Sequence, residues 1–335
     1  MSSSPEHGLL TIDNKGQPRL SRSYTLNFIG DWGQANFHRI CGWLTQEFCD
    51  RSGAQSRVAI WSIRGGGIEA LPLVHEGEAQ LAIVTPAAFM NKALKGEEVF
   101  QSPMPNLRAL AVLPQNDKLV LAINPKFHIS TFEQLRATKP ALRIAASIDD
   151  GTNFIGYVSR KYMEAHGISE GELKSWGGRY VTFHRPDGCL RLMEDGEVDA
   201  VIQEAIMTPQ WSRIVEGNKA QPLPAEPTAL EKLERGLGLG MNSLPKGFWS
   251  NLGKDLPTLD FSDFVIVVRD DLPDEVAYLL TWCLVETRAR IEAQYKHLPP
   301  EKSPLSYPLD PRKMAKTSLP LHPGSRQYYV EHELI

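Results

Sequence analysis

Runs typical of β-strands alternate with runs typical of α-helices along most of this chain, and this alternation constrains its fold more than any other feature. The first two strand-like runs, 24–29 and 58–63, are each followed by a glycine-containing turn and a helix-like run, at 34–50 and 68–76. Further strands are expected at 80–85, 107–113, 118–123, 142–147, 180–184, 199–204 and 261–268. Successive strand–helix units favour largely parallel sheets with right-handed connections. The sequence therefore predicts an α/β protein.

The expected strands also suggest how the chain divides. Strand runs near 118–123 and 261–268 are expected to cross between two sheets, so that both chain ends belong to the same lobe. On this reading residues 1–22 form an N-terminal extension, 23–121 plus 268–335 form lobe one, and 122–267 form lobe two. We expect an interlobe cleft between mixed, mostly parallel sheets.

The two early glycine turns are the first candidate binding positions. A helix N-terminus exposes unpaired N–H groups and positive dipole charge, and glycine lets a ligand approach the backbone closely. Sheets of this class bind ligands beyond the carboxyl ends of their strands. The turns are therefore good positions for a small polar or anionic molecule. The same pattern also occurs where an α/β protein merely reverses direction, and that alternative stays open.

Composition and motifs exclude several function classes. With 335 residues, of which 42% are hydrophobic and 23% charged, the chain can bury a large core. Its net charge is −4 and its basic residues are scattered among acids, so nucleic acid is not expected as a partner. Zinc-spaced cysteines, a phosphate-binding Gly-Lys-Ser loop and a Gly-x-Ser-x-Gly elbow are all lacking. No metal and no cofactor are therefore expected.

The beginning of the sequence bears on where the protein works. Residues 1–8 lack the basic start, apolar stretch and cleavage site of a secretion signal, and no apolar run approaches the ~20 residues of a membrane span. We therefore expect a cytoplasmic location and no membrane segment. The sequence leaves a homodimer open.

Four segments carry a resemblance to a known family: 73–84, 195–200, 265–275 and 321–329. Together they resemble the TAXI family, the extracytoplasmic solute receptors of tripartite transporters, in the same order over roughly 24–333. The resemblance implies the two-lobed type II periplasmic-binding-protein fold, with lobes that close on a small organic anion, commonly an amino acid or a carboxylate. A small-molecule carboxylate is the partner that we expect.

The resemblance also places the ligand contacts. In the family the first turn is rich in Thr and Gly, whereas here it contains Asp31, whose charge requires a compensating cation for an anion to bind. Arg64 is the first candidate because its guanidinium matches a carboxylate in a planar fork, and Arg179 and Arg185 are alternatives. The turn at 147–153 corresponds to the family's second anion-binding position, although an Asp there also commonly caps a helix. The expected ligand-binding residues are Trp32, Gly33, Gln34, Arg64, Gly65, Gly66, Gly67, Asp150, Gly151, Thr152 and Gln203.

Acidic residues at these positions raise a second hypothesis. Glu204 ends an expected strand, and with Asp31 and His38 it would form an acid/base set for proton transfer. The leading hypothesis is a cytoplasmic lyase of solute-receptor fold, such as a decarboxylase or dehydratase acting on an organic carboxylate in the cleft. The alternative is a non-catalytic TAXI-like protein that binds a small organic anion or an amino acid.

Overall fold

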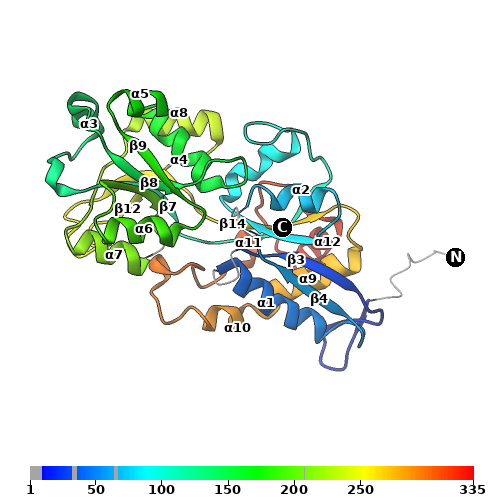
Figure 1. Ribbon diagram of the computed structural model, residues 1–335. Helices are drawn as coiled ribbons and strands as arrows, with labels where there is room; N and C mark the ends of the chain where they lie inside the picture. The colour runs from blue at the N-terminus through cyan, green and yellow to red at the C-terminus, as the bar shows by residue number, and fades with distance from the viewer. Residues whose placement is uncertain (1–9, 32–35, 64–66, 207) are drawn as a thin grey trace. The chain divides into compact units, whose positions relative to one another are not determined.

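The computed structural model describes residues 10–31, 36–63, 67–206 and 208–335 (Figure 1). Contacts within the chain define two compact units. Unit 1 comprises Met1–Ile63, Ala70–Pro114 and Phe264–Ile335, and unit 2 comprises Arg64–Glu69 and Gln115–Asp263. The division expected from the sequence would cut β7 (Lys118–Ile123) and β14 (Phe264–Arg269), each of which lies wholly within one unit.

The sheet of unit 1 has five strands in the order β4-β3-β5-β14-β6. Its bounds are β3 (Thr25–Ile29), β4 (Arg57–Trp61), β5 (Leu81–Val84) and β6 (Leu107–Leu113), with β14 as above. β3 runs parallel to β4 and β5, whereas β14 runs antiparallel to both β5 and β6. β5 is buried along its whole length, and β14 is buried at every residue except the last. Such burial is typical of central strands in a sheet that is covered on both faces.

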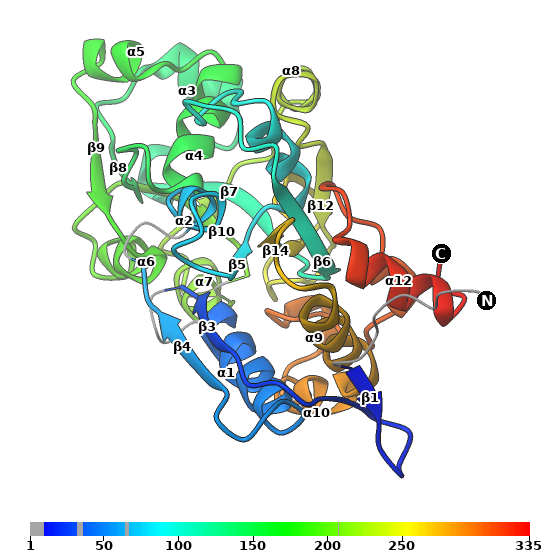
Figure 2. The same cartoon turned by 90° about the vertical axis from the view of Figure 1, so that its right-hand side faces the viewer.

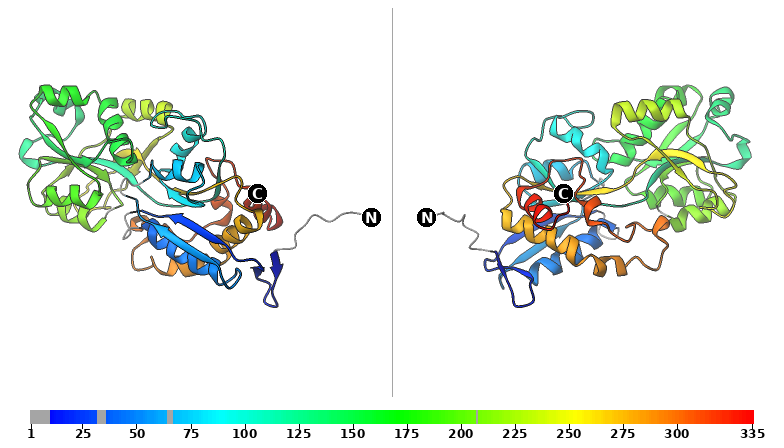
Figure 3. Two further views of the ribbon diagram at one scale, coloured as in Figure 1. Left: turned by 45° about the vertical axis from the view of Figure 1, so that its right-hand side comes forward. Right: turned by 180° about the vertical axis from the view of Figure 1, so that it is seen from behind.

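Helices cover this sheet. α1 (Asn36–Cys49) and α12 (Pro323–Glu331) both pack against α9 (Asp274–Glu286), and Figure 2 shows α9 beside α1. α2 (Ala70–His75) packs against β5, β14 and β6. The remaining helices are η1 (Ala87–Leu94), α10 (Arg288–Ala293), η3 (Pro300–Lys302) and α11 (Pro311–Met314). A hairpin of β1 (Leu10–Ile12) and β2 (Pro18–Leu20) lies beside α9 (Figure 3).

The sheet of unit 2 has seven strands, in the order β12-β13-β7-β10-β8-β9 with β11 also paired to β7. Besides β7, they are β8 (Arg143–Ser147), β9 (Arg179–Phe183), β10 (Ala200–Glu204), β11 (Gln221–Pro222), β12 (Met241–Leu244) and β13 (Leu256–Asp260). β10, β8 and β9 are parallel, and the other pairs are antiparallel.

Mixed sheets are thus confirmed, but the antiparallel share exceeds the expectation. The chain enters unit 2 shortly before β7 and leaves it shortly after β13, so these neighbouring strands run in opposite directions. β6 and β14 are antiparallel in unit 1 for the same reason, because the chain leaves that unit after β6 and returns to it at β14.

Two pairs of helices enclose the unit 2 sheet, one on each face (Figure 1). α4 (Phe154–Ala165) packs with α8 (Pro227–Leu237), and α6 (Pro186–Glu194) packs with α7 (Thr208–Glu216). The shorter helices are η2 (Pro125–Phe127), α3 (Phe132–Thr138) and α5 (Glu170–Ser175). Under α6 and α7 the core includes Trp211 and Trp249, whose stacked ring centroids lie 5.5 Å apart.

Among the described residues, none of the helices combines the length and apolar character needed to cross a membrane. The same residues contain no group of three His, Cys, Asp or Glu side chains arranged to hold a metal ion.

Candidate ligand-binding site

The first expected binding turn lies in unit 1, between β3 and α1. Trp32, Gly33 and Gln34 fall outside the described residues. Gly30, directly after β3, is pressed against α1: a Cβ added there would lie 2.9 Å from the His38 Cα. This close approach requires glycine and brings the end of the strand against the first turn of the helix.

Asp31 occupies the N-terminus of α1. Its side chain is buried; one carboxylate oxygen accepts from the Phe37 N–H at 2.9 Å and the other from the His38 N–H at 3.2 Å. A carboxylate is favourable at a helix N-terminus because unpaired amides and the helix dipole both attract it. Burial raises the pKa of Asp31, and the two backbone hydrogen bonds oppose that shift. The protein's own carboxylate thus takes amides that the turn was expected to offer to a ligand.

Two further side chains belong to this helix start. The Asn36 amide donates to the Pro304 carbonyl at 2.8 Å and accepts from the Tyr295 hydroxyl, so the C-terminal part of unit 1 holds α1 in place. His38 is half-buried, and within the described chain its Nδ1 is buried without a hydrogen-bond partner.

The second glycine turn leads into unit 2. Arg64, Gly65 and Gly66 lie outside the described residues, whereas Gly67 is described. Gly67 has φ +144, and a Cβ added there would lie 2.8 Å from the Phe154 ring. The Ile68 N–H donates to the Thr152 carbonyl at 3.1 Å. These contacts fix residues 67 and 68 against the start of α4, next to the other expected binding turn.

The turn before α4 uses its own donors. The Asp150 carboxylate accepts from the Thr152 N–H at 3.1 Å and from the Thr152 hydroxyl at 2.6 Å, and the hydroxyl contact is the main reason that the pKa of Asp150 is lowered. Asn153, and neither of the aspartates, caps the helix, accepting from the Gly156 N–H at 3.1 Å. Gly151 has φ +84 and open space beside it. The expected Thr152 donors are therefore engaged within the turn.

Gly156 sets the distance between α4 and β8. A Cβ added at this position would lie 1.7 Å from the Ile148 carbonyl oxygen, so only glycine fits. This approach encloses Ser147, at the end of β8, and Asn153, both of which are fully buried.

A buried polar pair lies at the carboxyl ends of β8 and β10, which are adjacent parallel strands. Gln203 is fully buried, and its Nε2 donates to the Ser147 hydroxyl at 2.7 Å. In the described part of the chain the other end of the amide, Oε1, is buried without a partner. A buried amide that makes only part of its hydrogen bonds is costly, so this is a position where a ligand group would be stabilising.

Glu204, the next residue, takes part in a different network. It hydrogen-bonds to Asp117, which also accepts from the Lys118 N–H at 2.7 Å, the Ile206 N–H at 3.1 Å and the Gln115 side-chain amide at 3.1 Å. Burial raises the pKa of Asp117 well above the usual range. The proposed acid/base set is divided between the units, with Asp31 and His38 in unit 1 and Glu204 in unit 2.

The alternative cations are not at this strand edge or are already paired. Arg179 is exposed and begins β9, whereas the binding edge lies at the strand ends. The Arg185 Nε is 3.1 Å from the Asp187 carboxylate in an exposed ion pair. Arg160, on α4, was not among these alternatives; its guanidinium lies 3.5 Å from the centroid of the Tyr180 ring, and within the described residues its Nη1 is buried without a hydrogen-bond partner.

The sequence reasoning included Ser147 and Asn153 in the 147–153 turn but assigned no role to their side chains, and it did not name Asp117. Asn153 directly precedes the apolar start of a helix, which is a usable N-cap signal. Ser147 and Asp117 stand at a strand end and just before a strand, and only the strand pairing shows what they contact.

Comparisons with known proteins agree with this architecture. The chain resembles the solved structure of XAC2383 from Xanthomonas citri bound to ATP, with 10% identity, 92% of this chain and 95% of that chain covered, and a TM-score of 0.51. It also resembles a structure described as a periplasmic transporter, with 12% identity, coverage of 92% and 93%, and a TM-score of 0.49. MatC (Rpa3494) from Rhodopseudomonas palustris with bound malate gives 10% identity, coverage of 92% and 98%, and a TM-score of 0.48.

The expected fold class is confirmed in its α/β composition and its mixed sheets. A comparison with curated protein sequences gave no match. The model of the NMT1-like family matches residues 43–332, which is most of the chain. This protein is therefore a member of the NMT1-like family.

Proposed function

We propose that this protein binds a small organic anion, with a carboxylate as its recognised group, and that it does so without catalysis, as TAXI-type solute receptors do. Membership of the NMT1-like family and the periplasmic-binding-protein fold support a binding role. The observation that carries the proposal is the buried Ser147–Gln203 pair, whose amide has one end without a partner in the described part of the chain.

The position of this pair supports ligand contact. Ligands of open α/β sheets bind beyond the carboxyl ends of parallel strands, and Ser147 and Gln203 end two such neighbours. An unpaired buried amide group costs about 1–3 kcal/mol, which a ligand with a complementary group would offset. Gln203 thus confers specificity for a ligand that also carries a hydrogen-bonding group near its carboxylate.

The rest of the binding site is proposed from neighbouring residues. Gly67 and Ile68, which follow the second glycine turn in the sequence, pack against the start of α4. We assign the carboxylate of the ligand to Arg64, with the amides of Gly65 and Gly66 as further donors. Gly151, which has open space beside it, completes this side of the site.

The lyase hypothesis has weaker support than binding. Asp31 accepts two backbone hydrogen bonds at α1, and the Glu204 carboxyl is paired with Asp117. A general acid or base must reach the proton that it transfers, and these groups are engaged inside the protein. The arrangement favours holding a ligand over transforming it.

A ligand screen with one matched substitution tests this function. Small carboxylates are screened by thermal shift, and each hit is measured by calorimetry on the wild-type protein and on Gln203→Met. Because Met conserves volume but cannot hydrogen-bond, binding should fall at least about tenfold while the melting temperature is kept or raised. Gln46→Met, at an exposed position of α1, is the control and should bind like wild type.

Two results would contradict the proposal. The first is a carboxylate that binds Gln203→Met and wild type equally well. The second is release of carbon dioxide or water from a hit, abolished by Glu204→Gln, which would establish the lyase alternative.

A further inference from the structure

A cavity of about 540 Å³ is lined by residues of unit 1 and includes none of the residues assigned to the ligand above. Four segments that are distant in the sequence form it: the hairpin turn between β1 and β2, Arg51 just after α1, the junction of α9 and α10, and His332 just after α12. Trp282, from α9, contributes an aromatic wall. The cavity is thus a meeting point of the N-terminal and C-terminal parts of unit 1.

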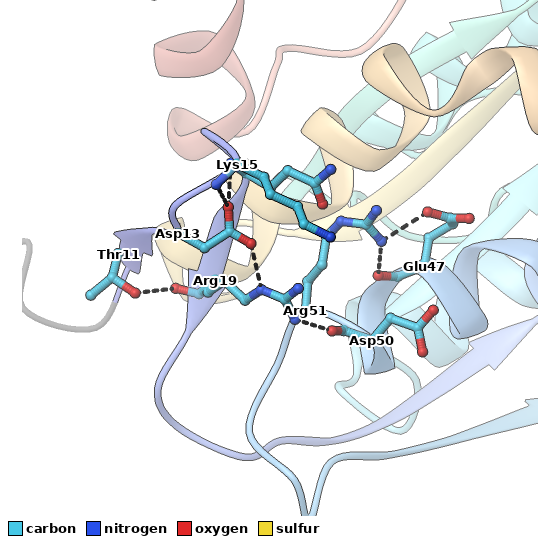
Figure 4. A network of polar contacts seen from close by, with 8 residues as sticks. Thr11, Asp13, Lys15, Arg19, Glu47, Asp50 and Arg51 are labelled. Carbon is cyan, nitrogen blue, oxygen red and sulfur yellow. Dashed lines mark hydrogen bonds and ion pairs between the residues drawn. The ribbon is translucent and has the colours of Figure 1, made fainter.

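Two arginines of the cavity share one buried glutamate. The Arg51 Nη1 donates to the Glu47 carboxylate at 2.8 Å and to the Glu47 carbonyl at 2.9 Å. The other oxygen of the same carboxylate accepts from Arg290 at 2.7 Å. Figure 4 shows Arg51 bound to Glu47, and Lys15 on the nearby hairpin turn, where its backbone N–H donates to Asp13. A single carboxylate thus bridges two guanidinium groups, and the Asp50 carboxylate adds a further favourable charge interaction with Arg290.

Three cations, Lys15, Arg51 and Arg290, line the cavity together with one carboxylate, Glu286, which accepts from the Tyr328 hydroxyl at 2.6 Å. The Glu47 and Asp50 carboxylates act on the arginines from outside this lining. The Arg51 side chain is only 6% exposed. Within the described residues its Nε is buried and has no hydrogen-bond partner. A buried arginine with unused donor capacity favours an incoming acceptor.

We propose that this cavity is a second binding site, specific for a small oxyanion of the carboxylate or phosphate class. Guanidinium groups bind such oxygens through parallel N–H donors, and Lys15 supplies a point charge from the opposite segment. The Trp282 ring, 5.0 Å from the Arg51 guanidinium carbon, holds that guanidinium on its face. The site is independent of the Ser147–Gln203 pair, which belongs to unit 2.

Occupancy of the site has a physical consequence for unit 1. An anion that contacts Lys15, Arg51 and Arg290 joins the hairpin to α1 and α10. Any ligand that binds the folded state alone stabilises it by mass action. Anion binding should therefore protect residues 13–17 and 286–290 from hydrogen exchange.

The experiment uses the full-length protein with two separate probes, inorganic phosphate and citrate, at constant ionic strength set by sodium chloride. Melting temperature and hydrogen exchange are followed during each titration. We expect saturable stabilisation by at least one probe, with protection at 13–17 and 286–290. Response to phosphate alone identifies a phosphate site, and response to citrate alone identifies a carboxylate site.

Two variants and a control locate the effect. Lys15→Ala removes an exposed cation of the cavity and should weaken binding about tenfold without loss of folding. Arg290→Lys keeps the charge but loses the planar fork and should weaken binding as well. Lys95→Ala, whose side chain is 74% exposed elsewhere in unit 1, should respond like wild type.

The inference is overturned if neither probe stabilises wild type beyond chloride, or if Lys15→Ala and Lys95→Ala respond identically. Gln203→Met separates this site from the proposed function, because that variant should keep the full response to the anion. A lost response with normal carboxylate binding at Gln203 defeats only this inference, and the reverse result defeats only the proposed function.

Discussion

The starts of α1 and α4 have similar backbone arrangements, but a carboxylate occupies the N-terminus of α1 and a neutral amide caps α4. Each helix follows a parallel strand, and each is approached so closely by backbone that a glycine is required, Gly30 at α1 and Gly156 at α4. At α1 the amides are held by the carboxylate of Asp31, whereas at α4 the cap is the neutral Asn153. A helix N-terminus attracts negative charge in either case, but unit 1 supplies that charge itself.

This difference explains why the ligand contacts are assigned to unit 2. Beside the neutral cap, the Ser147–Gln203 pair keeps one amide end unpaired among the described residues, and no such group adjoins the Asp31 contacts in the described part of unit 1 except the His38 Nδ1. The capacity of a helix start to bind a ligand therefore depends on whether the protein has already filled it.

The largest effect is expected from the glycines that set the two close approaches. Gly156→Ala places a methyl group 1.7 Å from the Ile148 carbonyl, whereas Gly30→Ala places one 2.9 Å from the His38 Cα. We expect Gly156→Ala to destabilise the protein by about 3 kcal/mol or more, and Gly30→Ala by about half as much, in chemical denaturation.

Gly236→Ala is the matched control for both changes. Gly236 lies inside α8 with no atom within 4 Å of an added Cβ, so alanine should stabilise by up to about 1 kcal/mol. Equal losses at all three positions would show that the close approaches are not what these glycines provide.

The next largest effect is the pH dependence of stability that His166 in unit 2 should produce. The His166 Nδ1 lies 2.7 Å from the Tyr162 carbonyl, and the His166 Nε2 accepts from the Glu226 N–H at 3.0 Å, an arrangement that only the neutral ring allows. Burial lowers the pKa of His166 to about 4. Because the unfolded chain binds a proton that the folded ring refuses, stability should fall as pH drops below about 6.5, by about 3 kcal/mol in total near pH 4.

Unfolding free energies at several pH values between 7 and 4.5 measure this slope. His166→Gln, which cannot titrate, should flatten it. An unchanged slope in that variant would assign the acid sensitivity elsewhere, for example to the buried His322 of unit 1, whose pKa is also lowered by burial.

The smallest effect tests the caps directly. Asp31→Ala removes the acceptor of two backbone N–H groups, and Asn153→Ala removes the acceptor of one. We expect losses of about 1–2 kcal/mol and about 1 kcal/mol respectively. In Asp31→Ala the freed amides should also let formate or acetate raise the melting temperature, and in Asn153→Ala these ions should do so less. The comparison fails if both variants respond alike.

The sequence predicted the strands with long apolar runs most accurately. β6 and β7 have the expected bounds: β7 is buried along its whole length, and β6 is buried at every residue except Arg108 and Val112. β12 and β13 were missed: Met241–Leu244 and Leu256–Asp260 have few apolar residues and form only through pairing with β7 and with each other.

Two helical regions differ from what the sequence predicts, one by an additional helix and one by a break. Three prolines, at 222, 224 and 227, favour a surface segment in the sequence, but Pro227 takes the first position of α8, where a missing N–H costs nothing. The sequence also predicts a single helix over 274–295. In the structure α9 ends at Glu286 and α10 begins at Arg288, with the Thr287 hydroxyl donating to the Cys283 carbonyl at the break.

The candidate site could be predicted only in part. Gln203 was among the expected ligand-binding residues, and the structure gives it a buried partner. Thr152 was expected to donate to a ligand, and the sequence could not show that Asp150 takes both of its donors. Whether a polar group is available depends on its neighbours in space, which residue spacing does not reveal.

The place of β14 in unit 1 constrains how the protein is made. This strand lies between β5 and β6, yet it is synthesised only after residues 115–263. Until then β5 and β6 lack the neighbour that joins them, whereas the residues of the seven-stranded sheet are already complete. Unit 2 should therefore fold first during synthesis. Until β14 is added, the part of unit 1 that precedes it would expose unpaired strand edges, which makes it a substrate for chaperones.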